Sequence, residues 1–153
     1  MWTLPDAITP AMPSRRRTYL DALRAVIERC RNELLVVSPF LDPGGIGSVF
    51  TPLVTALARG VRVTFVSHDV LTIGSLNGRA LEELRREASR VGGQLTVYSA
   101  AAGSGPDRRL HPLLHAKLVV SDGENVLLGS ANLTSYALCE CWSRSAAPAG
   151  LEV

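Results

Sequence analysis

The sequence predicts an α/β sandwich whose mixed β-sheet is flanked by helices. Segments with helical and strand periodicity alternate along the chain, which is the pattern of α/β domains. A turn at Asp122-Gly123 joins two apolar runs and predicts an antiparallel hairpin, so the sheet should be mixed. The chain has 153 residues, 46% of them hydrophobic and 20% charged, which suits one domain with a real core.

The first half of the chain predicts two helices and two strands. Residues 1–13 contain three prolines and are expected to form an irregular N-terminal arm, followed by the domain itself over residues 14–138. The expected elements are a helix over 14–31 capped by Ser14, a strand over 33–38, a loop over 39–47, a helix over 48–59 and a strand over 61–67. His68 follows that strand, and we interpret it as a loop histidine with satisfied hydrogen bonds rather than a site residue.

The second half predicts one long helix, three strands and a last short helix. Residues 77–91 form a strongly charged amphipathic pattern, which Gly92-Gly93 ends. The elements expected after it are a strand over 94–98, a flexible loop over 100–109, a strand around His115, a returning strand over 126–128 and a helix over 132–138. No internal repeat is visible.

One segment carries most of the chemical information. His115-Ala-Lys117 is followed after four residues by Asp122, and after six more by Gly129-Ser130-Ala-Asn132. Side chains two apart on a strand share a face, so His115 and Lys117 should project together. The antiparallel return should then bring Gly129-Ser130 close to them.

The same alternation assigns the apolar neighbours of the motif to the interior. Leu118 and Val120 lie at the positions between the polar ones, and we expect them to face the core.

These side chains suit a phosphate group. Lys117 supplies a positive charge with several donors. Ser130 and Asn132 supply neutral donors. His115 carries an imidazole, which can act as a nucleophile or as an acid and base. The segment therefore predicts a phosphate site with a histidine at its centre.

The motif resembles the HKD motif of the phospholipase D superfamily, and the resemblance extends over about Leu20 to Leu138. The segments 34–40, 58–65 and 110–117 also look like the family's pattern. The chain is most similar to short bacterial proteins with one HKD copy. These include a small metal-independent endonuclease and the phospholipase D-like component of DISARM-type anti-phage defence.

The resemblance implies a two-step displacement at a phosphodiester. His115 would be the nucleophile and form a phosphohistidine, and Lys117 and Asp122 would complete the catalytic motif. Lys117, Ser130 and Asn132 would hold the substrate phosphate. No metal or other cofactor is expected. One copy per chain implies that a second histidine comes from a second chain, in a C2 homodimer.

The C-terminal region departs from the family pattern. Single-copy nucleases usually carry a glutamate about eleven residues after the motif's asparagine, and that carboxylate orients the histidine. Here Ser143 stands at that position and Glu140 lies three residues earlier. Residues 139–153 are therefore expected to be a divergent tail, and a truncation after about Leu138 is one explanation.

The composition limits the kinds of partner and the cellular compartment that we expect. The net charge of +2 and the isoelectric point of about 8.6 are mildly basic and do not by themselves indicate nucleic acid. Three cysteines without a CxxC pair argue against a disulfide framework or a zinc site. No segment approaches twenty consecutive apolar residues and residues 1–13 lack a signal-peptide pattern. We therefore expect a cytoplasmic protein without a membrane partner.

Three functions are compatible with these observations. The leading hypothesis is a metal-independent phosphodiesterase or nuclease that acts on DNA or RNA as a homodimer, in anti-phage defence or DNA processing, with other defence proteins as partners. A phosphatidyl-group hydrolase or transferase is the second, and it should show an exposed apolar rim. The third is a catalytically inactive nucleic-acid-binding module of a multi-protein complex, which Ser143 favours.

Overall fold

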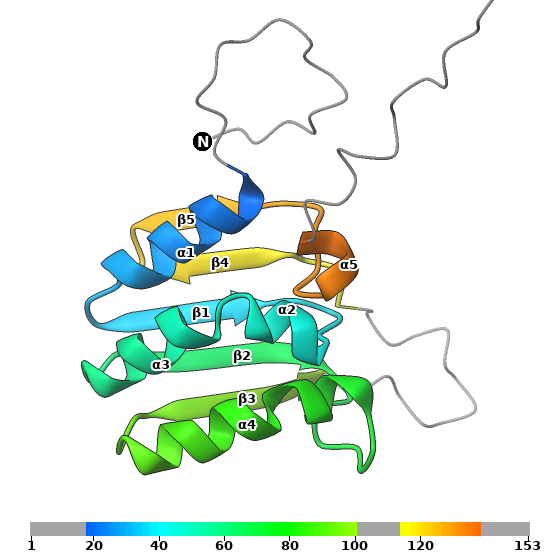
Figure 1. The fold of residues 1–153 in the computed structure, drawn as a ribbon. Coiled ribbons are helices and arrows are strands. Elements are labelled where there is room, and N and C mark those ends of the chain that lie inside the picture. Colours follow the sequence, from blue (N-terminus) through cyan, green and yellow to red (C-terminus); the bar gives the residue numbers. More distant parts are fainter. Residues whose placement is uncertain (1–17, 101–113, 139–153) are drawn as a thin grey trace, which may run out of the picture.

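A computed structural model describes residues 18–100 and 114–138, which form one five-stranded sheet with helices (Figure 1). The strand order is β3-β2-β1-β4-β5. The strands are β1 (Glu33–Val37), β2 (Arg62–His68), β3 (Leu95–Ala100), β4 (Leu118–Ser121) and β5 (Asn125–Leu128). The first three are parallel, whereas β4 pairs antiparallel with β1 and β5 antiparallel with β4. The predicted mixed α/β sheet is confirmed.

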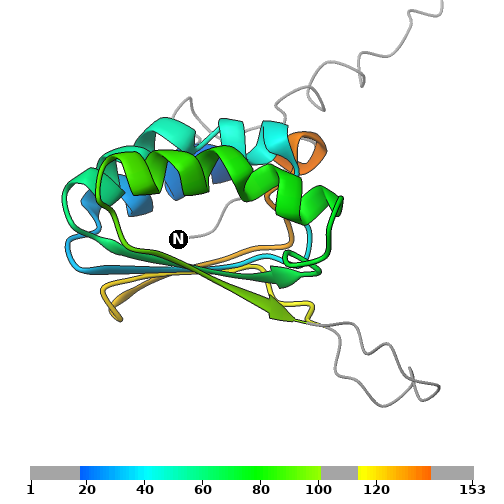
Figure 2. The ribbon, with the colours of Figure 1, turned by 90° about the horizontal axis from the view of Figure 1, so that it is seen from below.

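The helices pack on one face of this sheet. They are α1 (Tyr19–Arg29), α2 (Pro43–Gly47), α3 (Phe50–Ala58), α4 (Leu76–Arg90) and α5 (Ser135–Leu138). In Figure 2 the helices α1 to α4 lie on the same side of the strands, and the described residues place no helix on the other side. None of the described helices is long and apolar enough to cross a membrane.

The core lies between the sheet and these helices. Alternate strand residues point into it and are at most 5% exposed: Leu34, Val36, Val63, Phe65, Val119 and Leu127. Helix residues that are at most 1% exposed meet them: Leu23, Ile27, Leu53, Leu57, Leu81 and Leu84. The burial of this apolar surface is the main stabilising contribution to the fold.

The expectation that Leu118 and Val120 face the core is wrong. Val119, between them, faces the helices and is 2% exposed, whereas Leu118 and Val120 are half-buried on the opposite face. Because β4 is apolar at both alternating sets of positions, its sequence does not reveal which set the helices cover.

Helix boundaries also differ from the predictions. α1 begins at Tyr19 because Thr18 caps it: the Thr18 side chain accepts from the Asp21 amide, and the Asp21 carboxylate accepts from the Thr18 amide, both at 3.1 Å. The expected loop over 39–47 contains α2, which Asp42 caps and which has Pro43 in its first turn. The predicted arm at residues 1–13, most of the predicted loop over 100–109 and the tail over 139–153 lie outside the described residues.

Candidate active site

The predicted site residues gather where β4 begins. Because β4 runs antiparallel to β1, its start lies at the carboxyl ends of β1 and β2, the edge at which ligands bind in open α/β sheets. Leu114–Lys117 lead into β4 at this edge, and Gly129–Asn132 leave β5 there. The strand predicted around His115 therefore starts only at Leu118, and His115 itself precedes it.

His115 and Lys117 lie against each other. The Lys117 Nζ is 3.4 Å from the His115 Nδ1 and 3.5 Å from the Nε2, and it donates to the His115 carbonyl at 2.9 Å. The His115 side chain is exposed. An anionic group that approaches the imidazole would therefore also meet the ammonium group, as the phosphate interpretation requires.

Gly129 joins the second half of the motif to the first. Its amide donates to the Lys117 carbonyl at 3.2 Å, which fixes Gly129-Ser130 beside Lys117. Glycine is needed here because a Cβ atom would lie 2.7 Å from the Cε2 of the Tyr19 ring. Burial of that ring raises the pKa of the Tyr19 hydroxyl. Ser130 is exposed at the same edge.

Asn132 has an unpaired polar atom. Its side-chain Oδ1 is buried and finds no hydrogen-bond partner among the described residues. A half-turn of the amide would put the NH2 group there, and that group would need an acceptor such as a phosphate oxygen. A buried amide atom without a partner is costly, so this position suits a ligand contact.

A hydrogen-bond network that the sequence did not reveal supports the Gly129–Asn132 segment. The Leu133 amide donates to the Ser38 hydroxyl at 3.1 Å, and the Leu133 carbonyl accepts from the Asp42 amide at 3.2 Å. The Asp42 carboxylate accepts from the Ser135 amide at 2.9 Å and from its hydroxyl at 2.8 Å. A helix-capping aspartate before Pro43 was the one signal in the sequence that could have indicated this anchor.

The Asp42 carboxyl group is held ionised by these contacts. Its partial burial raises the pKa, but hydrogen bonds from Gly45, Ser135 and Gly44 outweigh burial, so the pKa lies below its ordinary value. Gly45 lies against the Leu133 carbonyl group so closely that a Cβ atom would not fit. The loop after β1 and the chain after the motif are thereby joined.

Asp122 is not brought together with His115 and Lys117. It follows β4, whereas Lys117 precedes it, so about 16 Å of strand separates the two residues. Its carboxylate accepts from the backbone amides of Arg31 at 2.9 Å, Asn32 at 2.7 Å and Glu33 at 3.0 Å. These bonds lower the pKa of Asp122 to about 2. The residue fixes the connection from α1 to β1 against the end of β4.

The other histidine and the cysteine among the described residues are buried, away from solvent. His68 is the last residue of β2 and is buried, so the prediction that it lies in a loop is wrong; both its ring nitrogens lie within hydrogen-bond distance of backbone carbonyls. Cys30 is fully buried and free. Within residues 18–100 and 114–138, no cluster of three or more His, Cys, Asp or Glu side chains could hold a metal ion. Glu140 and Ser143 lie outside the described residues.

A mixed sheet with a His-Lys pair and a Gly-Ser-x-Asn turn at one edge defines a phospholipase D-like α/β domain. Residues 23–143 match the family model described as "Cardiolipin synthase, PLD-like domain", and the chain belongs to this family. The predicted membership of the phospholipase D superfamily is thus confirmed. No significant match was found among curated protein sequences.

Two solved structures share the fold. The phospholipase D family member Nuc from Salmonella typhimurium is 22% identical, with a TM-score of 0.52 over 78% of this chain and 67% of its own. NucT from Helicobacter pylori is 15% identical, with a TM-score of 0.52 over 78% of this chain and 70% of its own. At these identities the likeness establishes the fold.

Proposed function

We propose that this protein is a metal-independent phosphodiesterase, most simply a nuclease, with His115 as its nucleophile. The observation that carries the proposal is the contact between the His115 imidazole and the Lys117 ammonium, at 3.4 and 3.5 Å, at the carboxyl-end edge of the sheet. Ser130 and Asn132 lie on the neighbouring segment, which the Gly129 amide ties to Lys117. The four side chains offer a nucleophile, a charge and neutral donors to one phosphate.

The proposed reaction proceeds in two displacements. A ring nitrogen of His115 attacks phosphorus, a P–N bond forms and the P–O bond to the leaving group breaks. A second, protonated histidine gives its proton to the leaving oxygen. Water then attacks the phosphohistidine and gives a proton to that second histidine, the P–N bond breaks and the phosphate ester leaves. Lys117 stabilises the charge on the non-bridging oxygens in both steps.

The second histidine would come from a second copy of the chain. We propose a C2 homodimer in which the two His115 side chains face each other across the axis, since each chain carries one HKD motif. DNA or RNA is the proposed substrate, and anti-phage defence or DNA processing the proposed setting, by resemblance to the single-copy bacterial proteins. Asp122 is proposed to act indirectly, by holding β4 in place.

The test is hydrolysis of bis(4-nitrophenyl) phosphate and of single- and double-stranded DNA in excess EDTA. We expect turnover that His115→Ala abolishes and that Arg62→Ala, at the opposite end of β2, leaves unchanged. Turnover that survives His115→Ala would contradict the assignment of the nucleophile. Absence of turnover from folded, dimeric protein would favour the inactive nucleic-acid-binding module instead.

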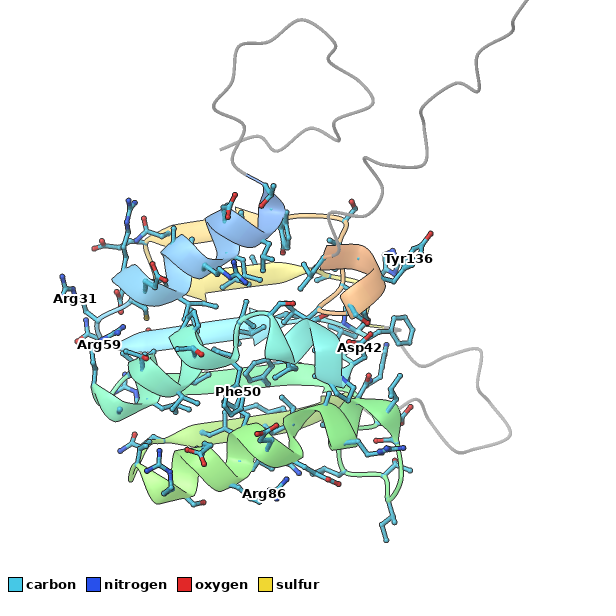
Figure 3. All side chains as sticks on the ribbon, viewed as in Figure 1. Arg31, Asp42, Phe50, Arg59, Arg86 and Tyr136 are labelled. Carbon is cyan, nitrogen blue, oxygen red and sulfur yellow. The ribbon has the colours of Figure 1, made fainter. Side chains whose placement is uncertain are left out.

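A second candidate function rests on a specific observation. Large apolar side chains are exposed by 55% to 101% around the same edge of the sheet: Phe40 after β1, Leu71 and Ile73 after β2, Leu76 at the start of α4, and Tyr136 in α5. Figure 3 shows Tyr136 and the site-supporting Asp42 at one end of the molecule. Such a rim is what a phosphatidyl-group hydrolase or transferase would place against lipid.

One substitution distinguishes a lipid substrate from a nucleic-acid substrate. Ile73→Ser should reduce hydrolysis of phosphatidylglycerol vesicles if the rim docks on lipid, while hydrolysis of bis(4-nitrophenyl) phosphate should stay unchanged. Equal lipid turnover by both proteins would show that the rim does not dock on lipid, and no lipid turnover by either would leave nucleic acid as the favoured substrate.

A further inference from the structure

His68 makes two side-chain contacts that neither the motif nor the proposed reaction uses. Its Nδ1 lies 3.2 Å from the Ala100 carbonyl oxygen and its Nε2 lies 2.9 Å from the Leu114 carbonyl oxygen. Ala100 ends β3, and Leu114 is the first described residue after the segment 101–113. The ring therefore bridges the two points at which the chain leaves the sheet and returns to the motif.

The Leu114 carbonyl has a direct geometric link to the nucleophile. It belongs to the same planar peptide unit as the His115 amide, so a contact that fixes this carbonyl also fixes the orientation of the backbone at His115. At the other end of the short segment, the Lys117 carbonyl accepts from Gly129 at 3.2 Å. His115 thus lies between two anchors, one of which is the His68 ring.

The His68 ring is itself held firmly. It is 8% exposed, and its backbone amide donates to the Pro39 carbonyl at 3.3 Å. The buried Asn77 side chain donates to the His68 carbonyl at 2.7 Å. The Phe40 ring lies 6.0 Å away between centroids, tilted by 51°. The backbone of His68 is thus fixed by hydrogen bonds on both sides and its ring is buried beside Phe40, so the ring can link the position of β2 to that of Leu114.

Both contacts are made to carbonyl oxygens, which only accept hydrogen bonds, so the ring holds its partners by N–H donation. A phenylalanine ring at this position would offer neither carbonyl a donor.

We propose that His68 is a positioning residue, which orients His115 by bridging the Ala100 and Leu114 carbonyls. This inference rests on the proposed function for its effect on turnover, whereas its effect on the backbone does not. His68 touches no reacting group in this proposal. It fixes the position of the His115 backbone, and thereby the position of the His115 ring relative to the phosphorus atom of the substrate.

The test compares His68→Phe, which keeps a flat ring without donors, with His68→Gln, which keeps an amide with two N–H donors. A displacement of about 1 Å can cost about 100-fold in rate, so we expect His68→Phe to lower kcat on bis(4-nitrophenyl) phosphate by about 10- to 100-fold with little change in KM. His68→Gln should recover part of this loss. Arg62→Ala, on the same strand but at its other end, is the control and should keep the wild-type kcat.

Hydrogen–deuterium exchange separates this proposal from the proposed function. In His68→Phe the amides of residues 114–117 should exchange faster, while those of α1 and α3 should keep wild-type rates. This result would support the bridge even if the wild-type protein proved to have no phosphodiesterase activity. Wild-type exchange at 114–117 in His68→Phe would overturn the proposal. So would equal losses of kcat in the Phe and Gln variants.

Discussion

Replacing Gly45 by alanine should separate α2 from the chain that follows the motif. A Cβ atom at Gly45 would lie 2.6 Å from the Thr134 nitrogen and closer still to the Leu133 carbonyl group. Ordinary contact begins at 3.4 Å, so these backbone segments must move apart by more than about 0.8 Å. The neighbouring atoms belong to the backbone and cannot rotate away, so we expect a loss of about 1–3 kcal/mol in the free energy of unfolding.

Gly47 provides a matched control in the same helix, because a Cβ atom there would meet nothing within 4 Å. Gly47→Ala should be neutral or stabilise by up to about 1 kcal/mol. Urea denaturation measures both variants. If the proposed function holds, Gly45→Ala should also lower kcat by tens of fold, because it displaces the segment beside Asn132. Equal unfolding midpoints for the two variants would refute this reasoning.

Three further predictions concern hydrogen bonds that fix the edges of the sheet. The folded pKa of Asp122 is about 2, below the ordinary value of 3.8, so its contribution to stability is present above pH 3.8 and is lost as the pH falls through 2. The difference in urea midpoint between wild type and Asp122→Ala should therefore be large at pH 7 and vanish near pH 2. An equal difference in midpoint at the two pH values would contradict this assignment of the pKa. Asn77→Ala removes the acceptor of the buried Leu41 amide and should cost about 1–3 kcal/mol in the free energy of unfolding by the same assay. A wild-type midpoint would count against this prediction. The lowered pKa of Asp42 predicts that its hydrogen bonds with Ser135 are complete at neutral pH and weaken in acid. The protection factor of the Ser135 amide, which corrects the exchange rate for its intrinsic pH dependence, should therefore fall at low pH in wild type but not in Asp42→Ala.

Much of the fold could be predicted because periodicity is a local property. The alternation in β2 and the amphipathic pattern of α4 each lie within one segment and indicated the right element. Errors arose where two local signals competed. Gly44 and Gly45 suggested a loop, but an aspartate cap and a proline in the first turn make residues 43–47 helical.

The site was partly predictable for the same reason. His115 and Lys117 are two positions apart, so the spacing alone predicts that they meet. Asp42 and Ser135 are separated by 93 positions, and no local pattern reports that their side chains bond. Asp122 shows that a local motif can also mislead. Its place in the motif predicted a role in the reaction, whereas its carboxylate accepts hydrogen bonds from backbone amides at the far end of β4.

The position of β4 in the sheet has a consequence for how the chain folds. Leu34 of β1 pairs with Val63 of β2, 29 positions later, but with Ser121 of β4 only 87 positions later. Closing the longer loop costs about 1 kcal/mol more in chain entropy, and contacts of greater sequence separation form more slowly. We therefore expect the parallel strands and their helices to form first and the motif hairpin to join them afterwards. In pulse-labelled refolding, protection should reach β2 before β4, so the chain should complete the edge that carries His115 and Lys117 as the last step of folding.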